Sequence, residues 1–161
     1  MTPAIDALRK ACVAFRIHQY AHAGEASSCS GAAWGAEAVA RLGVPAGRVF
    51  KTLVVENDSG ALAVGIVPVA GQLDLKQLAK ALGCKKVGLA TPDRVVRSTG
   101  YVLGGVSPLG QKRRLPTVID ASAQHFETIF ISAGRRGLEL ELTPDDLAAQ
   151  LAARFADIRR A

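Results

Sequence analysis

Apolar residues recur at helical spacing at both ends of the chain. After Pro3, a residue type that is frequent in the first turn of a helix, the apolar positions predict a helix over residues 3–14. Cys12 falls on the apolar face of that helix, so we expect a buried and unreactive thiol there. A capping sequence at residues 143–146 precedes apolar positions that continue to Phe155, which predicts a closing helix.

Between these ends, runs rich in aliphatic residues predict strands. The expected strands span residues 16–20, 49–56, 61–67, 85–89, 117–120, 128–132 and 138–142. Further helices are expected at residues 33–42, from Asp74 to Leu82, and from Thr91 toward Arg97. The turn at residues 57–60 joins two of the strands into a hairpin, and the small polar residues 23–32 predict a mobile connection. This mixture predicts an α+β fold in a single domain over residues 1–161, with a curved sheet.

The composition is that of a globular chain with an aliphatic core, since 49% of the 161 residues are hydrophobic and only 5% are aromatic. The formal net charge of +6 favours a polyanionic partner. Three widely spaced cysteines argue against a disulfide framework. No apolar run reaches the roughly 18–20 residues of a membrane span, and the first residues are not typical of a signal peptide. We therefore expect a soluble cytoplasmic protein that binds neither a membrane nor DNA.

Residues 97–116 contain four glycines and two prolines and fit neither a helix nor a strand. Such a segment predicts a rigid loop whose backbone amides can face an anion or an oxyanion. Three cations, Lys112, Arg113 and Arg114, lie within it and would suit phosphates. The alternative is a glycine-rich turn with a solvated basic edge.

Lys51 interrupts an otherwise apolar strand, on the face that also carries Val49 and Leu53. An ammonium on an aliphatic face is costly unless it has a partner or lines a cavity. There it could orient an acyl carbonyl, stabilise an oxyanion or act as a base. The alternative is an exposed lysine on an edge strand.

The remaining reactive residue types form no recognisable site. His18 and His22 lie on a strand and its exit without a set of carboxylates, so we expect no metal and no cofactor. The sequence contains no nucleophile elbow, and Cys29 has no cationic neighbour that would activate its thiol. A side-chain nucleophile is therefore not expected.

Four segments, in this order, carry a resemblance to a known family: Val49–Leu53, Pro68–Asp74, Arg97–Tyr101 and Gly104–Gln111. They resemble the YbaK/EbsC branch of the bacterial prolyl-tRNA-synthetase editing-domain superfamily, and the resemblance spans essentially the whole chain. It implies one compact α+β domain, with a mixed curved sheet or a barrel-like core flanked by helices. Residues 24–31 are longer and less familiar than the corresponding family segment, and their role is left open.

The resemblance implies an enzyme that hydrolyses the ester between cysteine and tRNA(Pro), with Lys51 and Gly104 at the catalytic positions. The thiol of the bound cysteine would attack its own ester carbonyl and expel the ribose hydroxyl in a lyase-like release. Lys112, Arg113 and Arg114 would contact tRNA phosphates. The substrate-binding positions that the resemblance implies are Tyr20, Trp34, Thr52, Ser98, Thr99, Gly100, Gly105, Val106, Ser107, Pro108, Ser132, Gly134 and Glu139. Of these, Trp34 and Glu139 replace a phenylalanine and an aspartate that are usual in the family.

Two alternatives stay open at this point. The first is a related hydrolase that removes alanine from tRNA(Pro) with a water nucleophile. The second is a non-catalytic module that binds RNA or a synthetase. The family also implies two partners, the aminoacyl-tRNA itself and prolyl-tRNA synthetase in a transient complex.

Overall fold

The computed structural model describes residues 2–20 and 31–160, with side chains of the second range from Gly35 onward. The helices are α1 Pro3–Lys10, α2 Gly31–Leu42, α3 Leu75–Leu82, α4 Pro92–Thr99 and α5 Pro144–Leu151, with 3-10 turns at Ala46–Arg48 and Ala121–His125. The strands are β1 Arg16–Gln19, β2 Phe50–Asn57, β3 Leu62–Pro68, β4 Gln72–Leu73, β5 Val87–Leu89, β6 Thr117–Asp120, β7 Ile129–Arg135, β8 Leu138–Leu142, β9 Arg154–Ala156 and β10 Arg159–Arg160. Most of the predicted connection at residues 23–32 lies outside these ranges.

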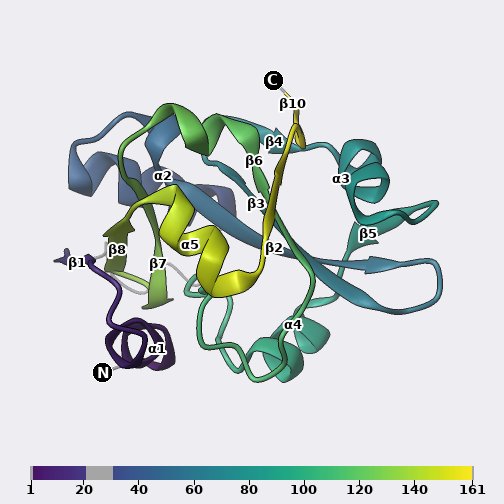
Figure 1. Cartoon of the computed structure of the whole chain (residues 1–161), viewed down its shortest axis with the longest axis horizontal. Helices are drawn as coiled ribbons and strands as arrows, with labels where there is room; N and C mark the ends of the chain where they lie inside the picture. Colours follow the sequence, from purple (N-terminus) through teal and green to yellow (C-terminus); the bar gives the residue numbers. More distant parts are fainter. Residues whose placement is uncertain (1, 21–30, 161) are drawn as a thin grey trace.

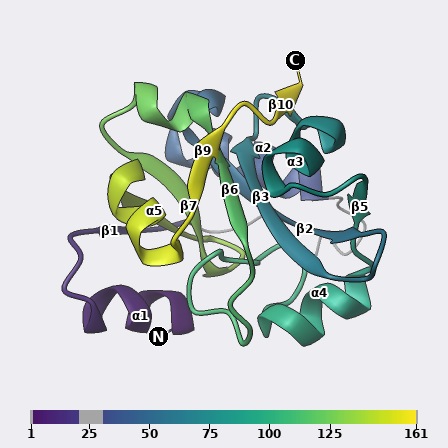
Figure 2. The same cartoon turned by 45° about the vertical axis from the view of Figure 1, so that its right-hand side comes forward.

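The strands of the described residues form three sheets, and the largest is mixed, as the family resemblance implied (Figures 1 and 2). Five strands lie in the order β5-β2-β3-β6-β9, in which the β2–β3 hairpin is antiparallel and β3–β6 and β6–β9 are parallel. A three-stranded antiparallel sheet has the order β1-β8-β7, and β10 pairs with β4. A single parallel bridge between Val49 and Phe130 joins the two larger sheets. The barrel-like arrangement therefore stays open, because the strand orders of the described residues do not close.

Alternation along β2 separates two apolar layers. Phe50 and Val54 face the main core, whereas Val55 faces a second cluster that α3 covers with Leu78 and Ala79. The Asp74 side chain caps α3 by accepting the Lys76 and Gln77 amide hydrogens, and Gly83 ends the helix at φ 77°, as predicted.

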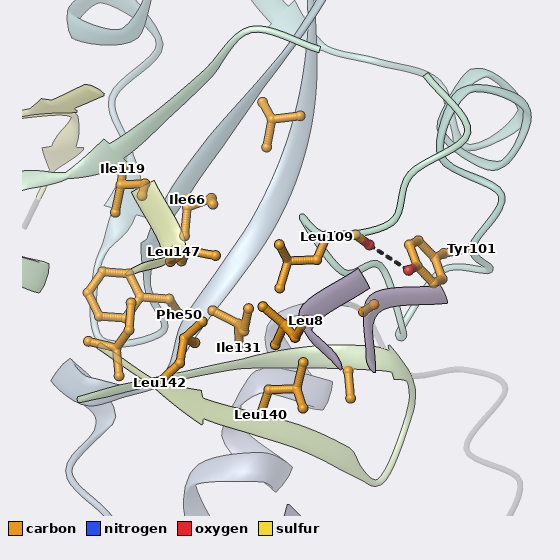
Figure 3. Packing of buried hydrophobic residues seen from close by; sticks show 14 of the residues in the cluster. Leu8, Phe50, Ile66, Tyr101, Leu109, Ile119, Ile131, Leu140, Leu142 and Leu147 are labelled. Carbon is orange, nitrogen blue, oxygen red and sulfur yellow. Dashed lines mark hydrogen bonds between the residues drawn. The ribbon is translucent and has the colours of Figure 1, made fainter. Parts of the chain in front are cut away.

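The main core lies between the two sheets and α1 (Figure 3). Ile5 and Leu8 of α1 are fully buried and pack with Ile131 of β7 and Leu140 of β8. Burial of each such side chain contributes about 1.5–3 kcal/mol. The hydrophobic effect thus fixes one face of the three-stranded sheet to α1, and its other face is left to carry polar residues.

That second face carries Ser132, Glu139 and Glu141, because side chains alternate across the β7–β8 pair. Helix α2 packs over it through Ala38, which lies in one apolar cluster with Val49 and Phe130. Polar side chains on a sheet face that is covered by a helix are typical of a ligand cavity.

The predicted helix over residues 3–14 is wrong in its last four residues, because α1 ends at Lys10. Cys12 adopts the left-handed conformation at φ 57°, and the Cys12 and Val13 amides donate to the Arg9 and Leu8 carbonyl oxygens. This is a Schellman motif, which glycine usually supplies. Cys12 is exposed, so the prediction of a buried thiol is also wrong.

The closing helix is corrected in the same way. Helix α5 ends at Leu151, Ala152 takes the left-handed conformation at φ 50°, and Phe155 lies in β9. Strands β4, β9 and β10 were not predicted. Among the described residues, no helix has the length and hydropathy of a membrane span.

Candidate active site

A cavity of about 380 Å³ lies between α2, the first half of β2 and the β7–β8 hairpin, a volume in the range of small-molecule sites. Its walls are largely apolar, with Ala38, Phe50, Leu53 and Val69 among them. Few polar groups project into such a site, so each of them constrains what the cavity can bind.

The cavity lies beside an open edge of β2. Strand β5 pairs with β2 only over Val55–Asn57, and the Ala90 amide donates to the Val54 carbonyl oxygen at 2.9 Å. Because backbone groups alternate between the two edges of a strand, the N–H and C=O of Thr52 point to the same edge, where β5 is missing. Lys51 and Thr52 project to opposite faces of β2 and still line one cavity.

Lys51 is half-buried, and burial lowers the pKa of its ammonium group. Among residues 2–20 and 31–160, no carboxylate forms an ion pair with it. An ammonium group in apolar surroundings interacts more strongly with a developing negative charge than an ammonium group in water does. The sequence left two alternatives for Lys51, a lysine that lines a cavity and a lysine on an edge strand. The structure has features of both, because Lys51 lines the cavity at a place where β2 is locally an edge strand.

Glu139 lies at the back of the cavity with 7% of its surface exposed. Burial raises the pKa of its carboxyl group to about 8, so the group is neutral and can donate a hydrogen bond near pH 7. Within the described part of the chain it makes no hydrogen bond or ion pair. A buried carboxyl group that the described residues leave without a partner is costly, which points to a partner that a ligand supplies.

Three hydroxyl groups line the cavity together with this carboxyl group. The Thr52 Oγ1 is buried and has no hydrogen-bond partner among the described residues. Ser132 lies opposite Glu139 in the β7–β8 register, and its Oγ accepts the Gly134 amide hydrogen at 3.2 Å. Tyr20 follows β1, and burial together with the charges of Glu139 and Glu37 raises its pKa to about 12. All three hydroxyls are therefore neutral near pH 7.

The rim of the cavity comes from the glycine-rich segment, through Leu103, Gly104 and Val106. Gly104 has φ 90° in a turn that the Gly105 amide closes by donating to the Val102 carbonyl oxygen at 3.1 Å. A Cβ on Gly105 would lie 2.5 Å from Arg135 Cα, so the loop packs directly on the end of β7.

The rest of this segment is buried and held by its own hydrogen bonds. The Tyr101 hydroxyl donates to the Leu109 carbonyl oxygen at 2.6 Å (Figure 3). Ser107 is fully buried and accepts the Leu109 amide hydrogen at 3.3 Å. These contacts hold the rim in one position against the core.

An ion pair connects α2 to the β7–β8 turn beside the cavity. Arg136 donates to Glu37 through Nε and Nη2, each at 3.0 Å, in a bidentate pair that is mostly buried. Sequence reasoning missed Glu37, Gly35 and Val69 as members of the site region. The adjacent cations Arg135 and Arg136 are the sequence signal that could have pointed to this turn.

The structure brings together seven of the predicted site residues, namely Lys51, Gly104, Tyr20, Thr52, Val106, Ser132 and Glu139. Behind the lining lie Gly105, Ser107 and Pro108 in the rim loop, and Gly134, which packs on the Tyr101 ring. Outside the cavity, at the end of α4, lie Ser98, Thr99 and Gly100. Exposed on the surface are Lys112, Arg113 and Arg114.

Trp34 belongs to α2, and its side chain lies outside the described part of the structure. His22 and Cys29 lie outside the described residues altogether. Among the residues that are described, no three His, Cys, Asp or Glu side chains gather as a metal site requires. In that same part of the chain the cavity offers the Lys51 ammonium group, the side chains of Arg135 and Arg136, one neutral carboxyl group and hydroxyls, but no nucleophile paired with a base.

Comparison with known proteins identifies relatives across most of the chain. Residues 30–149 match the family described as the aminoacyl-tRNA editing domain. EbsC of Enterococcus faecalis, named as a proposed Cys-tRNA(Pro)/Cys-tRNA(Cys) deacylase, is 42% identical over 124 residues, which cover 76% of each chain. The proline–tRNA ligase of Trichlorobacter lovleyi is 32% identical over 61% of this chain but only 17% of the ligase.

Solved structures share the whole fold. A crystal structure described as a proposed trans-editing enzyme for prolyl-tRNA synthetase has a TM-score of 0.80 and 23% sequence identity, and the match covers 100% of this chain and 99% of that one. The arrangement of helices around an open mixed sheet is therefore a known fold.

Proposed function

The chain belongs to the aminoacyl-tRNA editing domain family, and we propose that it is a deacylase that releases cysteine from mischarged Cys-tRNA(Pro). One observation carries the proposal: the cavity holds a half-buried lysine and hydrogen-bond donors, yet its described residues contain no nucleophile paired with a base. Such a site can orient a reactive substrate and stabilise charge without attacking the substrate. The 42% identical relative that is named as a proposed Cys-tRNA deacylase supports the choice of cysteine.

In the proposed reaction the substrate supplies the nucleophile. The cysteine thiolate attacks the carbonyl carbon of its own ester, the new sulfur–carbon bond forms, and the carbon–oxygen bond to the ribose breaks. The ribose oxygen takes up a proton, so the tRNA leaves with a free hydroxyl. The amino acid leaves as a cyclic thioester, which water then opens to free cysteine. Tethering the thiol beside its ester gives it a high effective concentration.

The described residues supply charge stabilisation in this scheme. The Lys51 ammonium group neutralises the oxyanion that forms on the carbonyl oxygen, in a site where apolar walls strengthen the interaction. Backbone groups of the turn around Gly104 hold the acyl end against the rim. The Thr52 hydroxyl and the neutral Glu139 carboxyl group have no partners of their own within the described chain, so both can bond to the substrate.

Selectivity follows from the chemistry of the bound amino acid. A cysteine thiol has a pKa of about 8.5 and is partly ionised near pH 7, whereas a serine hydroxyl stays protonated. Alanine has no nucleophile at all. Discrimination against both therefore needs no difference in binding.

We also propose that the protein works beside prolyl-tRNA synthetase. The support is that proline–tRNA ligases carry a similar segment within their own chains. A deacylase that meets the mischarged tRNA at the synthetase can take its tRNA selectivity from that enzyme.

A substrate panel tests the proposal. Purified protein is given tRNA(Pro) charged with cysteine, alanine or serine, with and without prolyl-tRNA synthetase, and the released amino acid is measured. We expect rapid release of cysteine alone. Equal release of alanine would identify a water-based hydrolase, and binding of charged tRNA without release would identify a non-catalytic module. Either result would overturn the proposal.

A further inference from the structure

A second cavity, of about 320 Å³, lies between α4 and the far end of the β2–β3 hairpin. Arginines supply three of its five lining residues, Arg94, Arg97 and Arg113, and the others are Leu62 and Ser98. In Figures 1 and 2, α4 lies beneath this hairpin, at the opposite end of β2 from α2. A hollow in which guanidinium groups make up most of the lining is unusual, because like charges repel unless an anion joins them.

The three guanidinium groups differ in what holds them. Arg94 pairs with Glu56 of β2 and donates to the Gly60 carbonyl oxygen at 3.0 Å, so it fastens α4 to the hairpin. Arg97 pairs with Asp93 at 3.1 Å, but both side chains are more than 70% exposed, and such a pair contributes little. Two carboxylates thus face three guanidinium groups, and Arg97 can exchange its partner at low cost.

Arg113 is the uncompensated cation. Its side chain makes no hydrogen bond or ion pair within the described residues. Its backbone amide donates to the Ser98 carbonyl oxygen at 3.1 Å, and the Lys112 amide donates to the Thr99 carbonyl oxygen at 3.1 Å. The backbone before the side chain is therefore fixed against the end of α4, which pre-positions the guanidinium group at the second cavity.

The basic triplet of the sequence does not act as one patch. Lys112 packs its stem over Gly100, and Arg114 donates to the Gln150 carbonyl oxygen of α5 at 3.3 Å. Arg113 alone lines the second cavity, where it joins Arg97, a residue from another element. Three cations that are adjacent in the sequence therefore contact different parts of the fold.

We propose that Arg97 and Arg113 form an anion site that binds a backbone phosphate of the tRNA acceptor strand, an inference that rests on the proposed function. A guanidinium group offers a planar pair of N–H donors that matches two phosphate oxygens. The segment from Gly100 to Arg113 borders both cavities, so a strand that leaves the first cavity past the rim reaches the second along the same segment.

The spacing of the two cavities sets which phosphate is bound. Lys51 and Glu56 are five residues apart on β2, which corresponds to roughly 17 Å along a strand. A strand stacked as in a DNA duplex advances about 3.4 Å per nucleotide and an unstacked strand advances further, so the second cavity lies within about five nucleotides of the ester. An aminoacyl-adenosine is too short to reach it, whereas an acceptor-stem minihelix is long enough.

Substrate length provides the test. The double variant Arg97→Gln/Arg113→Gln is compared with wild type on cysteinyl-adenosine, on a cysteinylated acceptor minihelix and on full Cys-tRNA(Pro). Lys85→Gln/Lys86→Gln is the matched control, because it removes the same two charges from exposed positions before β5. Binding of the uncharged minihelix is measured in parallel by fluorescence anisotropy across about 50–200 mM salt.

For the arginine variant we expect a rise in KM and in minihelix Kd of about tenfold at low salt, and a log–log salt slope that is flatter by about 0.7–0.9. Its kcat/KM on cysteinyl-adenosine should equal that of wild type, and the lysine control should change little on any substrate. Equal weakening by both double variants, or a loss that extends to cysteinyl-adenosine, would overturn the site. So would minihelix binding that the arginine variant leaves unchanged.

The binding arm separates this inference from the proposed function. If wild-type protein released no cysteine from any substrate, the deacylase proposal would fail, while the anisotropy measurement would still test the phosphate site. Arg97 and Arg113 are exposed, and neither takes part in the ion pair between Arg94 and Glu56. The variant should therefore keep the wild-type unfolding midpoint.

Discussion

Glu139 and Glu141 lie two residues apart on the same face of β8, yet the fold shifts their carboxyl pKa values in opposite directions. Glu141 accepts hydrogen bonds from Thr128 Oγ1 at 2.5 Å and from His18 Nε2 at 2.8 Å. These hydrogen bonds, led by that of Thr128, lower the pKa of Glu141. Glu139 lies deeper and is without such donors in the described chain, and burial raises its pKa to about 8.

We predict that Glu139 makes the fold less stable as pH rises. The folded chain keeps the proton on Glu139 up to pH about 8, whereas the unfolded chain loses it near its ordinary pKa of 4.5. The folded state therefore binds more protons across this window, and the free energy of unfolding falls as pH rises through it. A shift of this size corresponds to roughly 3–5 kcal/mol. Glu139→Gln should remove this loss, as measured by denaturant unfolding at about pH 5 and about pH 8.5.

Glu141→Gln is the matched control, since it should change the pH dependence of stability at acidic pH and not at alkaline pH. A lowered pKa contributes stability above the ordinary value of 4.5, and that contribution disappears as pH falls through the folded pKa. Removing Glu141 should therefore destabilise the protein near neutral pH and flatten its acid denaturation. A wild-type stability that is level between about pH 5 and about pH 8.5 would show that Glu139 is ionised in the folded chain.

The alternation at residues 138–142 predicted the strand and placed both glutamates on one face. It could not show which glutamate is buried, because α2, about a hundred residues earlier in the sequence, covers only part of that face. The sequence likewise could not show that Arg97 and Arg113 line one cavity. The backbone hydrogen bond from Arg113 to Ser98 brings their two segments together. Contacts between distant segments carry no local sequence signal.

Helix ends without glycine were the other source of error. Cys12 and Ala152 both take the left-handed conformation that usually marks a glycine cap, so the sequence gives no sign that α1 and α5 stop there. By contrast, the capping residues Asp74 and Gly83 bounded α3 correctly. Local chemistry thus determined the boundaries wherever the ordinary residue type was present.

We predict that Lys51→Ala lowers kcat/KM for Cys-tRNA(Pro) by about 10²–10³, the usual effect of removing one group that stabilises an oxyanion. The fold should be intact, because Lys51 makes no ion pair within the described chain and is only half-buried. Lys51→Arg should fail as well, since a guanidinium group differs in shape and hydration. Deacylation of Cys-tRNA(Pro) is the measurement, with circular dichroism to check the fold, and near-wild-type turnover in the alanine variant would contradict the assignment.

We predict that Thr52→Val separates activity from stability. The Thr52 hydroxyl is buried without a partner among the described residues, so its removal should leave the free energy of unfolding unchanged or raise it by about 1 kcal/mol. Activity should fall about tenfold, the value of one hydrogen bond to a charged group. Thr128→Val is a matched control. It should lower the free energy of unfolding, because the Thr128 hydroxyl contacts both Arg48 and Glu141. If Thr52→Val kept full activity, the hydroxyl would have no contact with the substrate.

We predict different effects for the two adjacent rim glycines. Gly105→Ala places a methyl group 2.5 Å from Arg135 Cα, so it should destabilise the fold by about 1–3 kcal/mol and shift the midpoint of thermal unfolding by several degrees. Gly104→Ala strains a residue at φ 90° on the cavity rim and should reduce kcat/KM more than stability. Thermal unfolding and deacylation rates are measured on both variants. If Gly104→Ala reacted at the wild-type rate, the loop would have only a structural role.

The last prediction concerns the nucleophile. Cys12 is exposed beyond α1, and Cys84 donates its thiol hydrogen to the Ala79 carbonyl oxygen at 3.6 Å beside α3. Neither lines the cavity, and Cys29 lies outside the described residues. A Cys12→Ser/Cys29→Ser/Cys84→Ser variant should therefore keep its activity on Cys-tRNA(Pro).

The complementary change is made in the substrate. S-methylcysteine adds one methyl group and has no thiolate to attack the ester. A tRNA(Pro) charged with it should therefore react at least about a hundredfold more slowly, because the tethered nucleophile is lost. The cavity of about 380 Å³ has room for the added methyl group, so a slow reaction would report chemistry and not exclusion. Equal competition by the methylated and unmethylated charged tRNAs would verify this. Rapid hydrolysis of the methylated substrate would instead require water or a protein group as the nucleophile, with Glu139, the buried carboxyl group of the cavity, as the first residue to test as its base.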